Sequence, residues 1–515
     1  MADVLQTIQA RLDDPSIPYQ KVVLVVLLAV SALESFIGSR QKPYLDSVRF
    51  PNLPQALRPF LTSPDAHDTY LKSQAYARHK LTFSSITRVA SLLESFVLLT
   101  DLALPVFPTT TTAPFPRRGG KWTLLKGMWD FAGRVTPGVG VVYGNGTSSS
   151  SSELRQTAMF IAIMNALGTL LAIPEGLYKN FVLEEKHGFN KMTYGTFVKD
   201  LFKGLALSFA LEIPLSTALV ALIRWVGNDA ILRLLAWVLG FSTVLVVVMV
   251  PLGPYVIMPL FNKFTLLATD SPVYPKVRAL AERVGFPCDR IYVIDGSKRS
   301  SHSNAFVTGI PGLQKQIVIY DTLLEKATPE EVEAILAHWK FSHIVYLLLT
   351  ALTQIAFSLS IFVLFLSNAS LLSSFGFTSS SSVVSKIVSS GVVDGATRTG
   401  GGPGPTVISL FLASTLFTPL SAFLSFVTNT ITRTLEYQAD AFAVSLGNET
   451  AQNLKTALIG IHEKNLAVYQ VDKIYSAYNH NHPTLVERLE ALDKGMTMAR
   501  RREEHDDEEE NKKTK

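Results

Sequence analysis

Apolar residues in this chain gather into long runs that are separated by polar segments. A helix needs about 20 mostly apolar residues to cross a bilayer. Seven runs approach or exceed that length: Val22–Ile37, Ile86–Phe107, Ala158–Leu177, Leu201–Ile223, Leu234–Leu260, Ile344–Leu366 and Val407–Val427. The pattern predicts a mainly α-helical, polytopic membrane protein with about seven transmembrane helices. The first run is short, and Pro251 and Pro254 interrupt the fifth, which leaves the count open by one.

Composition also indicates a membrane protein, and acidic residues within the predicted spans indicate an enclosed space. Hydrophobic residues make up 48% of the 515 residues and charged residues only 17%, against about 25% in soluble domains. The acids Glu34, Glu94, Asp101 and Glu212 nevertheless fall inside predicted spans. A carboxylate within a membrane usually faces water or a partner. We therefore expect the helices to enclose a water-filled chamber, although Glu34 and Asp101 lie close enough to span ends to reach the interface.

The loops between the spans predict an orientation. Basic residues are concentrated after the first and third spans, and basic loops face the cytosol. An odd number of spans then places the N-terminus in the lumen and the C-terminus in the cytosol. The sequons at Asn145 and Asn368 fall in predicted lumenal loops, which agrees. Basic residues after the second span weigh against this orientation.

The chain divides into five predicted segments. They are an N-terminal membrane domain of five spans (1–261), a soluble catalytic subdomain (262–343), the last two spans with a Ser/Gly-rich lumenal insertion (344–429), a helical C-terminal part of the catalytic domain (430–498) and a charged, disordered tail (499–515). Lys512 and Lys513 resemble a dilysine retrieval signal of the endoplasmic reticulum, and a solvated charge run is the alternative. No basic patch interleaved with aromatic residues indicates nucleic acid.

The soluble segment predicts a small α/β subdomain. A helical pattern over Val277–Val284 precedes strand-like runs at Ile291–Ile294 and Gln316–Tyr320. A helix then begins at Thr328, which with Glu331 has the pattern of a capping box.

That helix resembles the metal-binding helix of a zinc peptidase. Such a helix carries two histidines at i and i+4, with a glutamate after the first that deprotonates the metal-bound water. Here only His338 stands in a suitable place. Elsewhere, Glu436 and Asp440 are also four residues apart on a helix, where one carboxylate can bind metal and the other can orient a ligand. A solvated helix face is the alternative interpretation of that pair.

Several motifs together resemble the CAAX prenyl protease type I family of integral-membrane zinc endopeptidases. They are Glu184-Glu-Lys-His-Gly-Phe-Asn190, Pro259-Leu-Phe-Asn-Lys-Phe264, Asp295-Gly-Ser-Lys-Arg-Ser-Ser-His-Ser-Asn-Ala305, Glu436-Tyr-Gln-Ala-Asp440 and His482-Pro-Thr-Leu-Val-Glu-Arg488. The resemblance implies seven helices around a chamber, a zincin-like subdomain, one Zn²⁺ and residence in the endoplasmic reticulum membrane. It also implies removal of the C-terminal tripeptide from prenylated CAAX proteins, with membrane lipid as a further partner.

Residue by residue, the resemblance implies a site. His338 and Glu436 would be metal ligands, and Asp440 would orient a ligand histidine. His302 and Asn304 would lie at the substrate-binding edge, while His482 and Arg488 would line the catalytic end of the chamber. Without it, His302 and Asn304 are interpreted as turn formers and His482 as an exposed loop residue.

The chain departs from the family pattern at the metal helix itself. The family has Ala-His-Glu-Leu-Gly-His-Trp-Lys, whereas Ala337-His338 is followed here directly by Trp339-Lys340. The missing residues include the catalytic base and one ligand, and His343 lies at the wrong helical phase to replace it. Three hypotheses follow: a working peptidase whose printed sequence is in error, a pseudoprotease that binds prenylated or translocating chains without cutting, and an unrelated receptor or transporter. The last does not explain the motifs.

Overall fold

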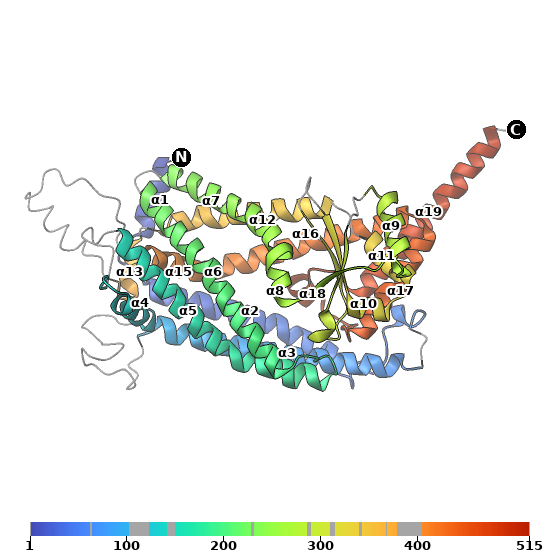
Figure 1. The fold of residues 1–515 in the computed structure, drawn as a ribbon, viewed down its shortest axis with the longest axis horizontal. Helices are drawn as coiled ribbons and strands as arrows, with labels where there is room; N and C mark the ends of the chain where they lie inside the picture. The colour runs from blue at the N-terminus through green and yellow to red at the C-terminus, as the bar shows by residue number, and fades with distance from the viewer. Residues whose placement is uncertain are drawn as a thin grey trace, which may run out of the picture.

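A computed structural model describes residues 2–61, 64–101, 123–141, 150–227, 231–285, 290–309, 315–338, 342–366, 368–377 and 404–513. Long helices run along the longest axis of the molecule, and a small sheet lies at one end (Figure 1). The N-terminus lies at the end opposite the sheet, and the C-terminal helix projects from the sheet end.

The membrane part is built of long apolar helices. Their bounds are α2 (Tyr19–Gln41), α3 (Ala66–Leu99), α5 (Ser150–Tyr178), α6 (Tyr194–Val226), α7 (Ile231–Leu252), α12 (Ser342–Val363), α15 (Thr406–Leu416) and α16 (Thr418–Ser445). Shorter helices accompany them: α1 (Ala2–Leu12), α4 (Leu124–Val135), α8 (Met258–Phe261) and α13 (Ala369–Ser374). A π-helical turn, Lys179–Glu184, extends α5.

The described residues contain somewhat fewer spans than the approximately seven predicted. In the described part of the chain, five helices are long and apolar enough to cross a membrane, and a sixth span is added if α15 and α16 are taken together. These two helices meet at an angle of 60°, at a break where Pro419, the second residue of α16, cannot donate a backbone hydrogen bond. The apolar part of α12, Leu349–Val363, falls short of the length required.

The acids predicted to face water have different surroundings. Glu94 lies on a cavity of about 460 Å³ between α3 and α5, together with Glu175. Glu34 instead accepts a hydrogen bond from Arg88 Nε at 2.9 Å. An ion pair and contact with a cavity each offset the free-energy cost of placing a carboxylate among apolar helices.

The soluble part contains the predicted α/β unit. Its elements are β1 (Phe264–Leu266), α9 (Val273–Arg283), β2 (Ile291–Ile294), β3 (Ala305–Gly309), β4 (Lys315–Tyr320), α10 (Asp321–Lys326), α11 (Pro329–Ala337), α17 (Asn448–Lys464), α18 (Lys473–Asn479) and α19 (Leu485–Lys513). The strand order is β1-β2-β4-β3, with β2 and β4 parallel and the outer pairs antiparallel. Alternating apolar residues such as Ile317 and Ile319 form a core with α9 and α11.

The C-terminal tail differs from the sequence prediction. The tail from 499 onward, predicted to be disordered, continues α19 as a helix to Lys513, and the described side chains beyond Arg500 are exposed.

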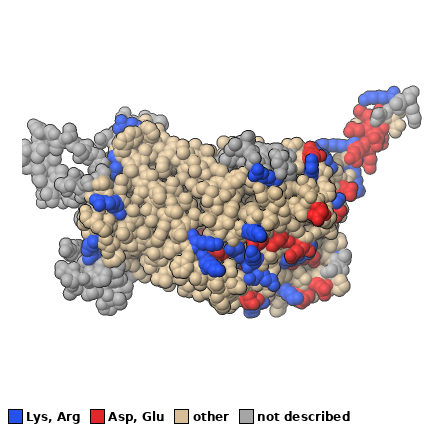
Figure 2. Space-filling model, viewed as in Figure 1, with Lys and Arg blue, Asp and Glu red and all other residues tan. Residues whose placement is uncertain are grey.

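Charge is distributed unevenly over the surface. Charged residues gather around the sheet and on this helix, whereas the surface over the long helices is largely free of charge in this view (Figure 2).

The sequon at Asn368 is not available for a glycan in this fold. Asn368 is only 1% exposed. Its Nδ2 donates to the carbonyl of Leu12 at 2.7 Å, and its Oδ1 accepts from the backbone N–H of Leu371. A glycan on Nδ2 would break the first contact, so Asn368 gives no support to the predicted orientation. The sequon at Asn145 lies outside the described residues.

Candidate metal centre

The centre of the site is the end of α11, which is held in place from both sides. Thr328 and Glu331 form the predicted capping box. Val332 and Leu336 pack into the core of the sheet, whereas Ala334 packs against Ala443 of α16. His338 follows Ala334 by four residues, so it lies on the face that looks toward α16.

His338 meets both acids of the predicted pair. Its Nε2 lies 3.0 Å from Oε2 of Glu436, and its Nδ1 lies 3.0 Å from Oδ1 of Asp440. Glu436 and Asp440 share one face of α16 because they are four residues apart. Asp440 is 1% exposed and His338 8%, so the three groups form a buried cluster rather than a solvated helix face.

Arg488 of α19 completes the buried cluster. Its Nε and Nη2 donate to the two carboxylate oxygens of Asp440 at 3.0 and 2.7 Å, a bidentate pair. Its Nη1 lies 3.6 Å from Glu436 Oε2. One guanidinium therefore neutralises part of the charge of a buried carboxylate, Asp440, and of a half-buried one, Glu436.

The surroundings of His338 stabilise its protonated form. Burial alone would lower the pKa of the imidazole, but its hydrogen bonds to Asp440 and Glu436 outweigh that effect, and the pKa of His338 is raised above its usual value. His482 reaches the same carboxylate from the outer side, with Nδ1 3.1 Å from Glu436 Oε2 and a side chain that is 57% exposed. His482 thus marks the solvent edge of the cluster.

The two residues predicted to bind substrate have different surroundings. His302 Nε2 is 3.5 Å from Glu184 Oε2, and its ring stacks on Phe189 at a centroid distance of 4.0 Å. Glu184 also accepts a hydrogen bond from the hydroxyl of Tyr76 at 2.8 Å. Asn304 is exposed, and its Oδ1 accepts from the N–H of Ala305. Sequence analysis missed the roles of Tyr76 and Glu184, although Glu184 begins one of the motifs that it identified.

The residues of the cluster do not fit a catalytic zinc ion. Such an ion needs three protein ligands around an open position, with Zn–N distances of about 2.0 Å. Here His338 and Glu436 hydrogen-bond directly to each other, and Arg488 Nη2 lies 3.3 and 3.5 Å from the two ring nitrogens. In the part of the chain that the structure describes, no group of three or more His, Cys, Asp and Glu side chains is arranged to hold a metal ion.

The helix also ends earlier than the sequence predicted. Helix α11 stops at Ala337 with His338 as its C-cap, and α12 begins at Ser342. The prediction of one helix through His343 was therefore wrong. The angle between His338 and His343 around a single helix axis is not defined, because the two residues do not lie on one helix. Residues 339–341 lie outside the described residues.

Comparisons with known proteins agree with this fold. Residues 47–263 match the family model described as CAAX prenyl protease N-terminal, five membrane helices, and residues 268–495 match the model of peptidase family M48. CAAX prenyl protease 1 of Saccharomyces cerevisiae is 34% identical over 489 residues, which cover 94% of this chain and 97% of that protein. The human homologue is 28% identical over 514 residues, which cover 91% of this chain and 94% of that protein.

A solved structure gives the same result for the fold. The crystal structure of S. mikatae Ste24p superposes with a TM-score of 0.74 at 32% identity, covering 93% of this chain and all of that one. The fold and these matches therefore define a membrane metallopeptidase of family M48 with a helical chamber. More narrowly, the chain belongs to the CAAX prenyl protease family.

Proposed function

We propose that this protein acts in CAAX processing as a membrane endopeptidase that removes the C-terminal tripeptide from prenylated proteins. The observation that carries the proposal is the 3.0 Å contact between His338 and Glu436, which lie 98 residues apart in the chain. This contact joins the end of the peptidase helix to an acid in the C-terminal half of α16. The names of the relatives, CAAX prenyl protease 1 and its homologues, support the substrate class.

The roles of the residues follow from their positions. His338 and Glu436 would hold the metal in a complete site, and Asp440 would orient His338 through its hydrogen bond to Nδ1. Arg488 and His482 would line the catalytic end, where a guanidinium and an exposed imidazole face the substrate. His302 and Asn304 would lie at the substrate edge, near the β3 strand.

The printed chain itself would bind such substrates without cutting them. It lacks the glutamate base and one histidine ligand, and Arg488 stands against both nitrogens of the histidine that is left. We infer that Zn²⁺ binds weakly or not at all and that hydrolysis requires the missing turn. This second candidate, a pseudoprotease that holds prenylated or translocating chains, is favoured by the position of Arg488.

The proposed location is the endoplasmic reticulum membrane, with a lumenal N-terminus and a cytosolic C-terminus. The two termini lie at opposite ends of the long helices (Figure 1), as this orientation requires. Lys512 and Lys513 end α19 at the tip of an exposed helix, where a receptor can reach a dilysine signal. Prenylated proteins and membrane lipid are the proposed partners, and nucleic acid is not one.

The experiment that tests the proposed function restores the missing turn. His-Glu-Leu-Gly is inserted between Ala337 and His338, and cleavage of a farnesylated CAAX peptide is compared with that of the parent chain. We expect cleavage only after the insertion, because the inserted glutamate supplies the base. Two insertions of equal length are matched controls: His-Gln-Leu-Gly lacks only the base, and Ala-Gln-Leu-Gly lacks the base and the ligand.

The outcomes separate the hypotheses. Cleavage by the parent chain would show that the missing residues are not needed, and no cleavage after insertion would refute the peptidase role. Sequencing the transcript across Leu336–Phe341 then decides between the candidates: a transcript that encodes His-Glu-Leu-Gly assigns hydrolysis to the natural protein, and one that lacks it assigns the binding role.

A further inference from the structure

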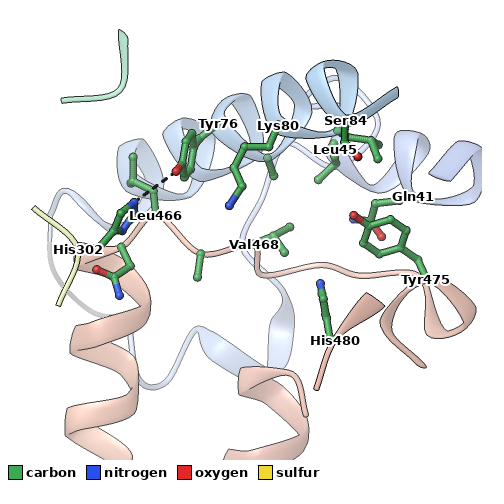
Figure 3. A pocket seen from close by; sticks show the side chains of 14 residues that line it. Gln41, Leu45, Tyr76, Lys80, Ser84, His302, Leu466, Val468, Tyr475 and His480 are labelled. Carbon is green, nitrogen blue, oxygen red and sulfur yellow. Dashed lines mark hydrogen bonds between the residues drawn. The ribbon is translucent and has the colours of Figure 1, made fainter. Parts of the chain in front are cut away.

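A second cavity lies beside the metal cluster and is not used by it. Its volume is about 410 Å³, which is in the range of small-ligand sites. It is enclosed by the end of α2, the middle of α3, the loop before β3, the 465–468 loop and α18 (Figure 3). These segments come from both the membrane part and the soluble part of the chain.

The ammonium group of Lys80 points into this cavity without an acidic partner. In Figure 3 its side chain extends from α3 into the open space. Its Nζ lies 4.8 Å from the centroid of the Tyr76 ring, a cation–π contact. Among the described residues, no carboxylate lies within ion-pair distance of Lys80. The nearby carboxylate of Glu184 attracts Lys80 through space but hydrogen-bonds to Tyr76 and His302 instead. The ammonium group of Lys80 is therefore free to contact an anion in the cavity.

The remaining lining combines imidazoles with aliphatic side chains. His302 and His480 lie on opposite sides of the open space, and Leu45, Leu466 and Val468 form apolar walls. Burial lowers the pKa of His480, so this residue is neutral at pH 7 and able to donate or accept a hydrogen bond. A single cation among aliphatic walls suits a small anion attached to an apolar stem.

The cavity is connected to the metal cluster by one segment of chain. Residues 473–482 supply Tyr475 and His480 to the cavity and His482 to Glu436. The segment is fixed to α16, since Arg433 donates to Ser476 at 2.8 Å. His480 and His482 are two residues apart, so their Cα atoms are separated by at most about 7 Å.

We propose that this cavity receives the C-terminal end of the prenylated chain, with Lys80 as the counter-ion of its free carboxylate and the apolar walls in contact with its aliphatic residues. The proposal rests on the proposed function and adds a group that recognises the free end of the substrate chain. Lys80 is then a specificity residue, because it distinguishes a free C-terminus from a chain that continues.

The test uses equilibrium binding to the full parent chain, which is proposed to bind without cutting. Two farnesylated tetrapeptides are compared, one with a free C-terminal carboxylate and one with a C-terminal amide. We expect the parent to prefer the carboxylate by about tenfold or more, as for other charge-assisted hydrogen bonds. The preference should fall to near unity in Lys80→Met and be retained in Lys80→Arg.

A matched control lies on the same helix. Lys72→Met removes an exposed lysine of α3 that pairs with Asp68 and does not line the cavity, and it should keep the preference of the parent. Melting temperatures show whether each variant is folded.

Three results would overturn the proposal. Equal affinity of the parent for the two peptides would show that no carboxylate is recognised. A preference that survives Lys80→Met would place the carboxylate elsewhere, while the proposed function would stand. Binding of neither peptide would remove both the proposed function and this inference. If the two peptides bind equally and an anionic phospholipid co-purifies with the parent but not with Lys80→Met, the cavity belongs to a lipid headgroup.

Discussion

The guanidinium of Arg488 lies against the imidazole of His338, with Nη2 3.3 Å from Nδ1. The same nitrogen donates to Asp440 at 2.7 Å. The positive charge that a metal ion would bring between histidine and carboxylate is thus supplied in part by an arginine. This relationship explains how the buried Asp440 and the half-buried Glu436 remain stable on α16 in a chain that lacks a complete metal-binding motif.

Removal of Arg488 should destabilise the fold strongly. Arg488→Ala leaves the carboxylate of Asp440, which is 1% exposed, without its bidentate partner. Loss of one member of a buried ion pair costs about 3–5 kcal/mol. We expect a clear drop in melting temperature in detergent. Arg278→Ala is the matched control, because Arg278 pairs with Glu282 on an exposed helix face. Equal effects of the two substitutions would contradict the buried ion-pair account.

The free energy of unfolding should decrease as the pH falls, because folding removes His462 from water. This side chain is buried next to the ring of Tyr469, and burial lowers the pKa of His462 from 6.5 to about 4. Between these values the unfolded chain binds a proton that the folded chain does not, so the free energy of unfolding decreases as the pH falls from 6.5 to 4 and is constant above 6.5. The loss approaches about 3 kcal/mol, at ~1.4 kcal/mol for each pKa unit.

The measurement is the melting temperature at pH 7 and pH 5. His462→Phe should reduce the difference between the two, since a phenyl ring does not titrate. His505→Phe, at an exposed position of α19, should leave it unchanged. An unaltered pH dependence in His462→Phe would show that other groups cause it.

Asn368 should act as a structural residue rather than a glycan acceptor. It caps α13 through Leu371 and holds the end of α1 through the carbonyl of Leu12. Asn368→Ala should cost about 1–2 kcal/mol, as for the loss of a cap and a buried hydrogen bond. Melting temperature measures this effect. A mobility shift with endoglycosidase that disappears in Asn368→Gln would contradict the buried position.

The sequence predicted the elements that local patterns control. The capping box at Thr328, the strands at Ile291–Ile294 and Gln316–Tyr320 and the placement of Glu436 and Asp440 on one helix face were confirmed, because each depends on residues close in the chain. The hydropathy runs located the membrane helices. Their number was less certain, since a break such as the one at Pro419 depends on packing between α15 and α16.

The contacts between distant segments were not predictable from one sequence. Nothing in the spacing of residues indicates that Arg488 contacts His338, or that Lys80 and His480 share a cavity. Such contacts depend on the packing of α3, α16 and α19. The early end of α11 was also missed, because the helical pattern continues past His338 in the sequence.

Metal content tests the central claim most directly. The claim is that His338 and Glu436 are what remains of a zinc site, which the missing turn would complete. The purified parent chain should contain almost no zinc, and the chain with His-Glu-Leu-Gly inserted before His338 should contain about one ion per molecule, as expected when three protein ligands are present. One zinc ion per molecule in the parent, or none after the insertion, would contradict the account.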